Sequence, residues 1–390
     1  MKIFKLKDIS EFIRNGVTIK QDISSKEGIP ITRIETISKG TIDFNKLGYA
    51  NIFKIEKYKE WLLKKGDILI SHINSEKHLG KSAIYLDNNY DIIHGMNLLC
   101  IRAIDKKVFP EYLQLFFKTN QYKKQIKKIT KKSVNQASFS VNDFKEILIT
   151  VPDLNIQEKI IKKIKVLEKI LENNKLKLVY LSELTKSLFT RMFGDIKSND
   201  KNWKIYKFSE KLKISSGGTP SKANKIYWEN GTISWIGSNM CNDEIITKND
   251  GKFITEEGLK NSSAKIYKMN TVIVALVGAT IGKTGLLKFE TSTNQNIAAL
   301  EIKNMDYSPE FLFFLLQNLY YKFTELGGDT FKMANLSFIK NLPLISPPIE
   351  LQNKFAERIE KIEKLKFEIE KSIEESQKLY NSLISKYFDN

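Results

Sequence analysis

The sequence is poor in the residues that cross-link chains or bind metals, with 2 cysteines and 3 histidines among 390 residues. Cys100 and Cys241 are too few for a disulfide framework and too few and too far apart for a zinc site, so we expect no metal. No apolar run approaches the roughly 18–20 residues that a membrane span needs. Residues 1–8 also lack the apolar core of a signal peptide. We therefore expect a cytoplasmic protein with no membrane partner.

Acidic residues are scarce relative to basic ones. The chain has 63 Lys and Arg against 45 Asp and Glu, which gives a net charge of +18. Such an excess favours a polyanionic partner, usually nucleic acid. A lysine-rich proteome with AT-rich codons would give a similar excess, because Lys, Asn and Ile are all plentiful here. Charge alone leaves both explanations open.

The chain contains a long internal repeat. Residues 110–117 and 309–316 both begin Pro-Glu and continue with apolar residues, as the first turns of a helix often do. Near the end of each half, Gln352 follows Gln157 by 195 residues, half the chain. Identity is low in the first portion of each half. The repeat predicts two modules that share a scaffold and carry different surfaces.

Each half ends in a long tail without Pro or Gly, residues 157–193 and 352–388. Apolar residues in these tails alternate four and three apart, which is the heptad pattern of a coiled coil. We expect the helix seam to include Ile164, Leu167, Leu171, Asn174 and Leu178 in the first tail and Ile359, Ile362, Lys366, Ile369 and Ile373 in the second. The polar seam residues Asn174 and Lys366 can fix register at some cost in stability.

The predicted fold class is α+β, with two similar mixed α/β bodies in tandem, each followed by a long helix. The expected boundaries are 1–155 for the first body, 156–195 for its helix, 196–349 for the second body and 350–390 for its helix. If the halves obey a pseudo-two-fold, the helices pair as an antiparallel coiled coil. A helix packed on its own body is the alternative, but at 1.5 Å per residue each tail is roughly 55 Å long and overshoots a small body.

One stretch looks at first like a nucleotide-binding loop: Val277–Thr284 reads VGATIGKT. Its glycines are separated by three residues, whereas a P-loop needs four to wrap a phosphate. We expect a tight loop after a strand that presents Lys283 and Thr284 outward, with Lys81 and Ser82 at the same place in the first half. A lysine beside a hydroxyl suits contact with phosphate or base edges. A plain surface turn is the alternative.

The sequence carries no recognisable catalytic constellation. Ser346-Pro347-Pro348-Ile349 lacks the aromatic residue that the motif of amino-methyltransferases places fourth to stack on a flipped-out base, and there is no F-x-G-x-G cofactor loop. All three histidines, His72, His78 and His94, lie in the first half. A catalytic histidine shared by both halves is therefore excluded, and we interpret the three as polar surface.

Candidate DNA-contacting residues are side chains of the types that read base edges or contact phosphates, although the same types are common in loops. In the first half they are Arg33, Lys81, Ser82 and Asn97, and in the second half Thr219, Ser221, Lys222, Trp235, Lys283, Thr284, Asn294 and Gln295.

These features together resemble the specificity subunit of type I restriction–modification enzymes. The resemblance covers the whole chain and rests on the repeat and on recurring strings. These are Ser216-Gly217-Gly218-Thr219-Pro220-Ser221, Gly278-Ala279-Thr280-Ile281-Gly282-Lys283, and Pro347-Pro348 with Leu351-Gln352. The first body departs from the pattern, because it opens Arg14-Asn15-Gly16-Val17 and has no Gly-Gly-Thr-Pro. Its base contacts are therefore harder to place.

The resemblance implies a non-catalytic subunit that binds double-stranded DNA. Its bodies would be target-recognition domains, each reading half of a split sequence, and its paired helices would fix their spacing. Two methyltransferase subunits would dock on this scaffold and methylate adenine N6, using S-adenosylmethionine that they bind themselves. Motor-nuclease subunits can join such a complex. The chain itself would bind no cofactor.

Three other interpretations stay open. The first is a stand-alone DNA-binding repeat protein without a methyltransferase partner, which off-seam apolar residues in the first tail disfavour: Leu176, Leu184, Phe189 and Phe193 suggest further partners. The second is an enzyme that uses the Gly282-Lys283-Thr284 loop for a nucleotide. The third is a coiled-coil adaptor that never meets DNA.

Overall fold

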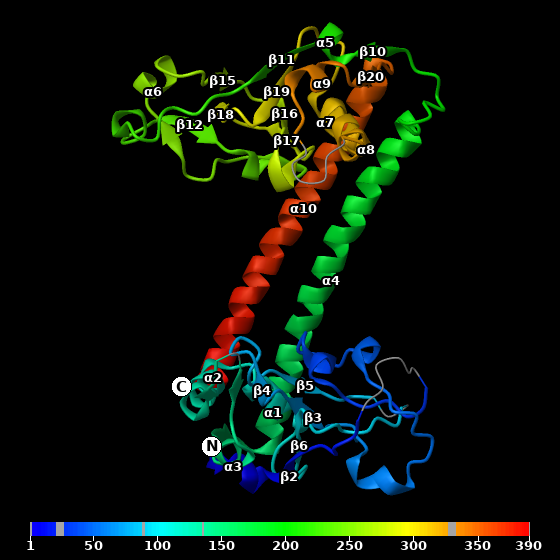
Figure 1. The fold of residues 1–390 in the computed structure, drawn as a ribbon, viewed down its shortest axis with the longest axis vertical. Coiled ribbons are helices and arrows are strands. Elements are labelled where there is room, and N and C mark those ends of the chain that lie inside the picture. The colour runs from blue at the N-terminus through cyan, green and yellow to red at the C-terminus, as the bar shows by residue number, and fades with distance from the viewer. Residues whose placement is uncertain (1, 21–26, 88–89, 135, 327–332, 390) are drawn as a thin grey trace. The chain divides into compact units, whose positions relative to one another are not determined.

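The computed structural model describes residues 2–20, 27–87, 90–134, 136–326 and 333–389. It separates into two compact units: unit 1 is residues 1–175 with 370–390, and unit 2 is residues 176–369 (Figure 1). Each unit contains one mixed α/β body and a part of both long helices. Among the described residues, no helix combines the length and the apolar character that a membrane crossing requires.

Unit 1 is built on a four-stranded antiparallel sheet in the order β2 (Ser10–Asn15), β6 (Leu99–Ala103), β3 (Ile68–Ile70) and β5 (Ser82–Ile84). The inner strands β3 and β6 are almost wholly buried, which is why both are apolar runs in the sequence. Two smaller sheets complete the strands of this body. In one, β1 (Lys2–Lys5) pairs with β9 (Leu148–Val151), and in the other, β8 (Ala137–Ser138) lies between β4 (Ile73–Asn74) and β7 (Lys131–Lys132). The α-helices of the body are α1 (Pro110–Phe116), α2 (Asn120–Ile129) and α3 (Val141–Lys145).

Unit 2 repeats this sheet and extends it. Strands β11 (Leu212–Ser216), β19 (Ile297–Ile302), β16 (Val272–Ala275) and β17 (Thr284–Leu287) follow the same order, and β13 (Glu244–Ile246) adds a parallel edge strand. A second sheet has the order β14 (Phe253–Ile254), β12 (Ile233–Ile236), β18 (Thr291–Thr293) and β15 (Ile266–Tyr267). A two-stranded sheet joins β10 (Ile205–Lys207) to β20 (Pro343–Ile345). The α-helices of this body are α5 (Phe208–Lys211), α6 (Glu256–Lys260), α7 (Pro309–Asn318), α8 (Tyr320–Thr324) and α9 (Leu336–Lys340).

The repeat extends into the portion where sequence identity is low. In unit 1, single-residue bridges join Gly48 to Ile31, Ile31 to Ile93, and Ile93 to Leu62. Their directions are antiparallel, parallel and antiparallel, as are those of β14–β12, β12–β18 and β18–β15 in unit 2. Unit 1 therefore holds the second sheet in reduced form. The prediction of two similar mixed α/β bodies in tandem is confirmed.

The long helices are α4 (Leu154–Phe193) and α10 (Ile349–Ile384), and α10 ends in a π turn. Every predicted seam position in them is buried or partly buried. In unit 1, Asn174 donates its side-chain N–H to the hydroxyl of Ser372 at 3.0 Å, so this polar seam residue contacts the other helix. Lys366 behaves differently, because it pairs with Glu363 of its own helix at 2.8 Å.

The off-seam apolar residues of α4 fall into two groups. Phe189 and Phe193 are 0% and 1% exposed and pack against Phe355 in the core of unit 2. The expectation that these two phenylalanines face further partners is therefore wrong. Leu176 and Leu184 are 46% and 52% exposed, so they remain available for contact.

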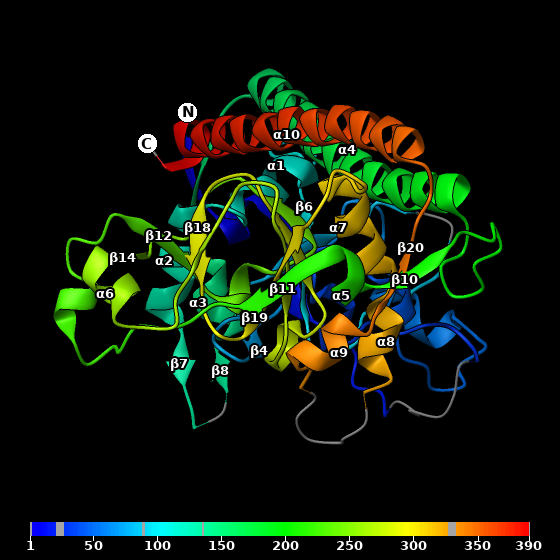
Figure 2. The ribbon, with the colours of Figure 1, turned by 90° about the horizontal axis from the view of Figure 1, so that it is seen from above.

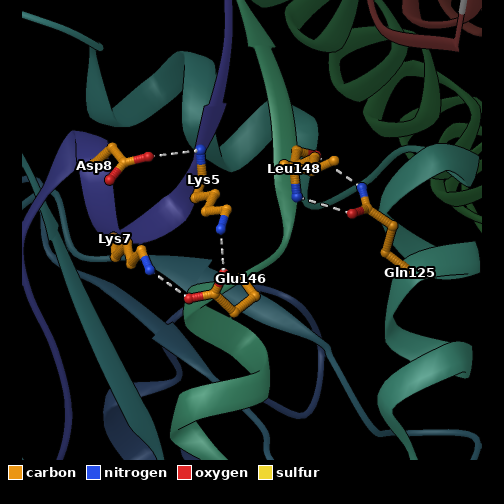
Figure 3. A network of polar contacts seen from close by, with 6 residues as sticks. All are labelled: Lys5, Lys7, Asp8, Gln125, Glu146 and Leu148. Atoms are coloured by element: carbon orange, nitrogen blue, oxygen red, sulfur yellow. Dashed lines mark hydrogen bonds and ion pairs between the residues drawn. The ribbon is translucent and has the colours of Figure 1, made fainter.

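An exposed ion-pair cluster joins the start of unit 1 to the segment after α3. The Glu146 carboxylate accepts from the ammonium groups of Lys5 at 2.7 Å and Lys7 at 2.6 Å (Figure 3). The hydrogen bonds from Lys5 and Lys7 lower the pKa of Glu146 to about 2. The first strand is thereby tied to the end of its own body.

A buried glutamine fastens the start of each long helix. The Oε1 atom of Gln157 accepts the N–H of Phe109 at 2.9 Å, and that of Gln352 accepts the N–H of Ser308 at 3.0 Å. Each amide nitrogen donates to the carbonyl of the proline five residues earlier, at 2.8 and 2.9 Å. Each also donates to one further backbone carbonyl. The same three bonds therefore hold the body to the helix in both units.

Replacing this glutamine should destabilise its unit. Gln352→Leu leaves one backbone N–H and two carbonyls buried without partners, at about 1–3 kcal/mol each. We expect the free energy of unfolding of unit 2 to fall by about 2–5 kcal/mol. Urea unfolding followed by tryptophan fluorescence reports this, because three of the four tryptophans lie in unit 2. Asn353→Leu, at the neighbouring exposed site on α10 in the same unit, is the control, and equal stability of the two variants would contradict the prediction.

Candidate nucleic-acid interface

Three segments of unit 2 that lie apart in the sequence meet at one junction. Gly218 donates its backbone N–H to the carbonyl of Thr293 at 2.9 Å, and Asn294 donates its N–H to the carbonyl of Ile236 at 3.1 Å. Gly217 is required at its position, because a Cβ there would lie 2.1 Å from the Thr293 carbonyl oxygen. The junction therefore unites the Gly-Gly-Thr-Pro, Trp-Ile-Gly and Asn-Gln-Asn segments.

Two tryptophans form a wall beside the junction. Trp235 is 6% exposed, and its indole N–H donates to the carbonyl of Gly218 at 2.9 Å. Trp228 packs against it in a T-shaped arrangement with ring centroids 5.2 Å apart, and donates to the carbonyl of Ser221 at 3.2 Å. Such aromatic pairs add about 0.5–1.5 kcal/mol beyond the area they bury. Hydrogen bonds from the two indoles to backbone carbonyls therefore fix the position of the wall.

A positively charged pocket opens against this wall. Besides the tryptophans, its lining includes Lys222, Lys225, Lys252, Asn239, Asn294 and Glu229. Three ammonium groups thus face a single carboxylate of the lining. The carboxylate of Glu229 is 3.8 Å from the ammonium of Lys225, and Lys252 pairs with Asp250 at 2.5 Å. Lys222 makes no hydrogen bond or ion pair with the residues that the structure describes, so its charge is available to an anion.

Asn239 brings an uncommitted amide to the pocket. It is exposed, and its side chain forms no hydrogen bond to any residue in the described part of the chain. Asn294 differs, since its Oδ1 accepts the N–H of Asn296 at 3.1 Å. An asparagine amide can pair with both N6 and N7 of adenine in the major groove. The pocket therefore offers an amide, an aromatic wall and lysines, which suit a base edge and its neighbouring phosphates.

The junction gathers six of the residues predicted for the second body. Lys222, Trp235 and Asn294 line the pocket, Ser221 is exposed beside them, and Thr219 donates its hydroxyl to Gln295 at 2.5 Å. The residue list drawn from the sequence missed Lys225, Trp228, Asn239 and Lys252. The three-residue spacing of Lys222, Lys225 and Trp228 was the available signal for two of them.

Lys283 and Thr284 do not join the pocket. The Asp243 carboxylate accepts a hydrogen bond from the ammonium group of Lys283 at 2.6 Å. It also accepts hydrogen bonds from the backbone N–H and the hydroxyl of Thr284, at 3.0 and 3.1 Å. Thr284 is 0% exposed, so the expectation that it faces outward is wrong. The hydrogen bond to Asp243 raises the pKa of Lys283. Gly278 and Gly282 have φ of 78° and 76°, as a tight loop requires.

Unit 1 repeats the junction with different residues. Val17 donates its N–H to the carbonyl of His94 at 2.9 Å, as Gly218 does to Thr293 in unit 2. Thr32 accepts the N–H of Gly95 on its hydroxyl at 2.9 Å. Gly16 again approaches the crossing backbone too closely for a side chain. The backbone arrangement is thus shared, although Gly-Gly-Thr-Pro is absent here.

The residues predicted for the first body divide between two places. Arg33 and Asn97 lie on junction segments; Asn97 is exposed, and the Arg33 guanidinium is 3.6 Å from the carboxylate of Glu35. Lys81 lies elsewhere and donates to a backbone carbonyl at 3.1 Å. Ser82 is 8% exposed on β5, so the expectation of an outward hydroxyl is wrong there too.

Two histidines of unit 1 are core residues. His72 and His94 are 4% and 2% exposed, so interpreting them as polar surface is wrong. Burial lowers the pKa of each to about 4, which keeps both neutral at pH 7. His94 hydrogen-bonds the carbonyl of Leu98 at 2.9 Å through Nε2. Within the part of the chain that the structure describes, no three His, Cys, Asp or Glu residues converge as metal ligands.

Comparison with known proteins identifies the class. The family model for the type I restriction modification DNA specificity domain matches residues 1–180 and 200–378. The chain therefore belongs to the type I restriction–modification DNA specificity family, whose members are non-catalytic specificity subunits.

Individual relatives agree with this membership. A Methanocaldococcus jannaschii protein assigned to the type I restriction enzyme MjaX as its specificity subunit is 30% identical over 385 residues, covering 93% of this chain and 87% of that protein. The MjaIX specificity subunit of the same organism is 24% identical over 301 residues, 72% of this chain and 68% of that protein. The S subunit structure from M. genitalium shares the fold, with a TM-score of 0.64 at 14% identity over 99% of this chain and 96% of that one.

Proposed function

We propose that this subunit reads a split sequence in double-stranded DNA, one half with each unit. The observation that carries this proposal is the repeated junction, in which Val17 and Gly218 make the same backbone hydrogen bond in the two units while the surrounding side chains differ. Two recognition surfaces that share a backbone arrangement but carry different side chains suit two different half-sites. The net charge of +18 supports it, because phosphate contacts supply much of the affinity of DNA-binding proteins.

We further propose that α4 and α10 pair as an antiparallel coiled coil that sets the distance between the half-sites. The buried seam positions and the Asn174–Ser372 hydrogen bond support this pairing. Successive major-groove faces of DNA recur about every 34–36 Å. A helical rod of roughly 55 Å is long enough to serve two such faces.

The partners we propose are two methyltransferase subunits, which bind S-adenosylmethionine and methylate adenine N6, and motor-nuclease subunits that join them in the cytoplasm. The chain itself would bind no cofactor. Large apolar side chains on the outside of the long helices support protein partners there. They include Leu176, Tyr180 and Leu184 on α4 and Leu365 and Phe367 on α10, each between 46% and 67% exposed.

Methylation-sensitive sequencing of host DNA, with and without this gene, tests the function. We expect a split motif, methylated at adenine in each half, that disappears when the gene is deleted and returns with a plasmid copy. An unchanged methylation pattern in a strain that expresses the chain together with its methyltransferase subunits would contradict the proposal.

Asn239→Ala should relax recognition in one half of that motif only. Loss of one bidentate base contact costs about 1–3 kcal/mol of discrimination, or about 5- to 150-fold at one base pair. Methylation rates of the purified complex on a library of single-base variants measure this. Asn261→Ala, an exposed asparagine after α6, is the control. A uniform loss across all positions, or relaxation in both halves, would count against the base contact.

Lengthening both long helices should lengthen the spacer of the motif. Inserting seven residues after Lys175 in α4 and after Lys371 in α10 keeps the heptad register and adds about 10 Å of helix. We expect a spacer longer by about 3 base pairs, since base pairs stack 3.4 Å apart. The methylated motif of the variant reports the result. The same insertion in α4 alone breaks the seam and serves as the control. An unchanged spacer in the double insertion would refute the proposal that the paired helices set the distance between the half-sites.

A further inference from the structure

One stretch of unit 1 has a charge that the proposed function does not use. Residues 112–142 contain seven lysines and no acidic residue. Six of these lysines fall within Lys123–Lys132, on α2 and β7. The corresponding stretch of the second half contains Glu325 and Asp329. The stretch of lysines without acidic residues is therefore found in unit 1 and not at the corresponding place in unit 2, so the scaffold that the two units share does not explain it.

The orientation of α2 is fixed on two sides. Tyr122 and Ile126 are buried in the core, and the Tyr122 hydroxyl donates to the carbonyl of Gly80 at 3.0 Å. On one flank, Gln125 exchanges two hydrogen bonds of 2.8 Å with the backbone of Leu148 (Figure 3). On the other flank, where Lys123 and Lys127 lie, the described residues form no such side-chain hydrogen bonds to α2. Lys124 and Lys128 lie between the two flanks, on the outermost face.

A groove runs along the free flank, between α2, β7 and the 76–81 loop. Its floor is apolar and includes Phe117, Tyr122 and Ile126, and five lysines line it: Lys77, Lys81, Lys123, Lys127 and Lys132. The hairpin of β7 and β8, which bounds it, projects from the body (Figure 2). The groove thus combines an apolar floor with a basic rim.

Not all of this positive charge is compensated. Lys132 pairs with Glu76, the single acidic residue of the lining, at 3.0 Å, and Lys81 donates to the carbonyl of Ser38 at 3.1 Å. Lys77, Lys123 and Lys127 have no hydrogen bond or ion pair with the residues that the structure describes. Three free ammonium groups therefore surround an apolar strip and favour an anionic ligand with an apolar portion.

We propose that this groove binds the sugar–phosphate backbone of one DNA strand, with Lys123 and Lys127 on phosphates and the floor against deoxyribose. The inference rests on the proposed function, in which unit 1 binds duplex DNA. The two lysines are one helical turn apart, about 5–6 Å between Cβ atoms, a spacing similar to that of successive phosphates. Lys77 adds a third free ammonium group from the 76–81 loop, so the charge is not confined to one helix and suits a polyanion better than a single acidic group. Phosphate contacts position a protein on DNA without reading its sequence.

The test compares two double variants that remove the same charge from the same helix. Lys123→Gln with Lys127→Gln removes the groove lysines, and Lys124→Gln with Lys128→Gln removes their outward neighbours. Each full-length variant, assembled with its methyltransferase subunits, is titrated at several salt concentrations with a duplex carrying the methylated motif and with a scrambled duplex. Losing two phosphate contacts should lower the slope of log affinity against log salt by about 1.8. We expect affinity for both duplexes to fall about 10- to 30-fold near physiological salt, with the methylated motif unchanged.

Other outcomes would overturn the inference. Equal losses in the two variants would mean that only net charge matters, and unchanged affinity in the groove variant would mean that no phosphate binds there. If the groove variant fails to assemble with its methyltransferase subunits while the variant chain alone still binds DNA as the wild-type chain does, the groove would be assigned to an acidic protein segment instead. A wild-type complex that binds both duplexes equally would refute the proposed function. The inference that the groove binds phosphates would not be affected by that result.

Discussion

Neither body completes its hydrophobic core without both long helices, and this constraint governs the rest of the molecule. In unit 2, Phe189 and Phe193 from α4 pack on Phe311 of α7 and also on Phe355 of α10. In unit 1, Phe388, just after α10, packs on Tyr112 of α1 with ring centroids 4.8 Å apart. Aromatic side chains of this size bury large areas and dominate core energetics. The helices are therefore parts of the recognition bodies, so a helix cannot shift without disturbing the core that orients the reading surface.

Much of the architecture could be predicted because it depends on patterns that are local or repeated in the sequence. The spacing of Gln157 and Gln352 gave the repeat, and the structure shows the reason, since each side chain makes the same three buried hydrogen bonds. The seam of the long helices follows from heptad spacing alone. Phe189 and Phe193 were misjudged because a helical pattern shows which face a residue lies on and not which body covers that face.

Individual site residues could not be predicted where a partner comes from a distant segment. Lys283 looked like a free cation beside a hydroxyl, yet Asp243 lies 40 residues earlier and reaches it only because β13 is added in parallel to β17. His72 and His94 are polar in sequence and buried in structure, where desolvation keeps them neutral. In each case the chemistry of a side chain is set by neighbours that spacing along the chain does not reveal. Trp228 is a further case, since its place in the pocket depends on packing against Trp235 and on a hydrogen bond to the carbonyl of Ser221.

The junction also explains how one scaffold can carry two different specificities. Its segments are held by backbone bonds, such as those from Val17 to His94 and from Gly218 to Thr293, which almost any sequence can make. Other side chains on these segments can therefore change without loss of the fold, provided that the glycine at the crossing is kept together with the side chains that bond the backbone there, Thr32 and Trp235. The side chains at the two junctions differ accordingly: unit 2 has an aromatic wall and an exposed asparagine amide, whereas unit 1 has Thr32 and the exposed Asn97. Away from its junction, unit 1 also has the lysine-lined groove of α2 and β7. If both bind DNA, unit 2 would draw more of its free energy from base contacts and unit 1 more from phosphates. Salt should then weaken unit 1 more than unit 2, because only phosphate contacts release counterions.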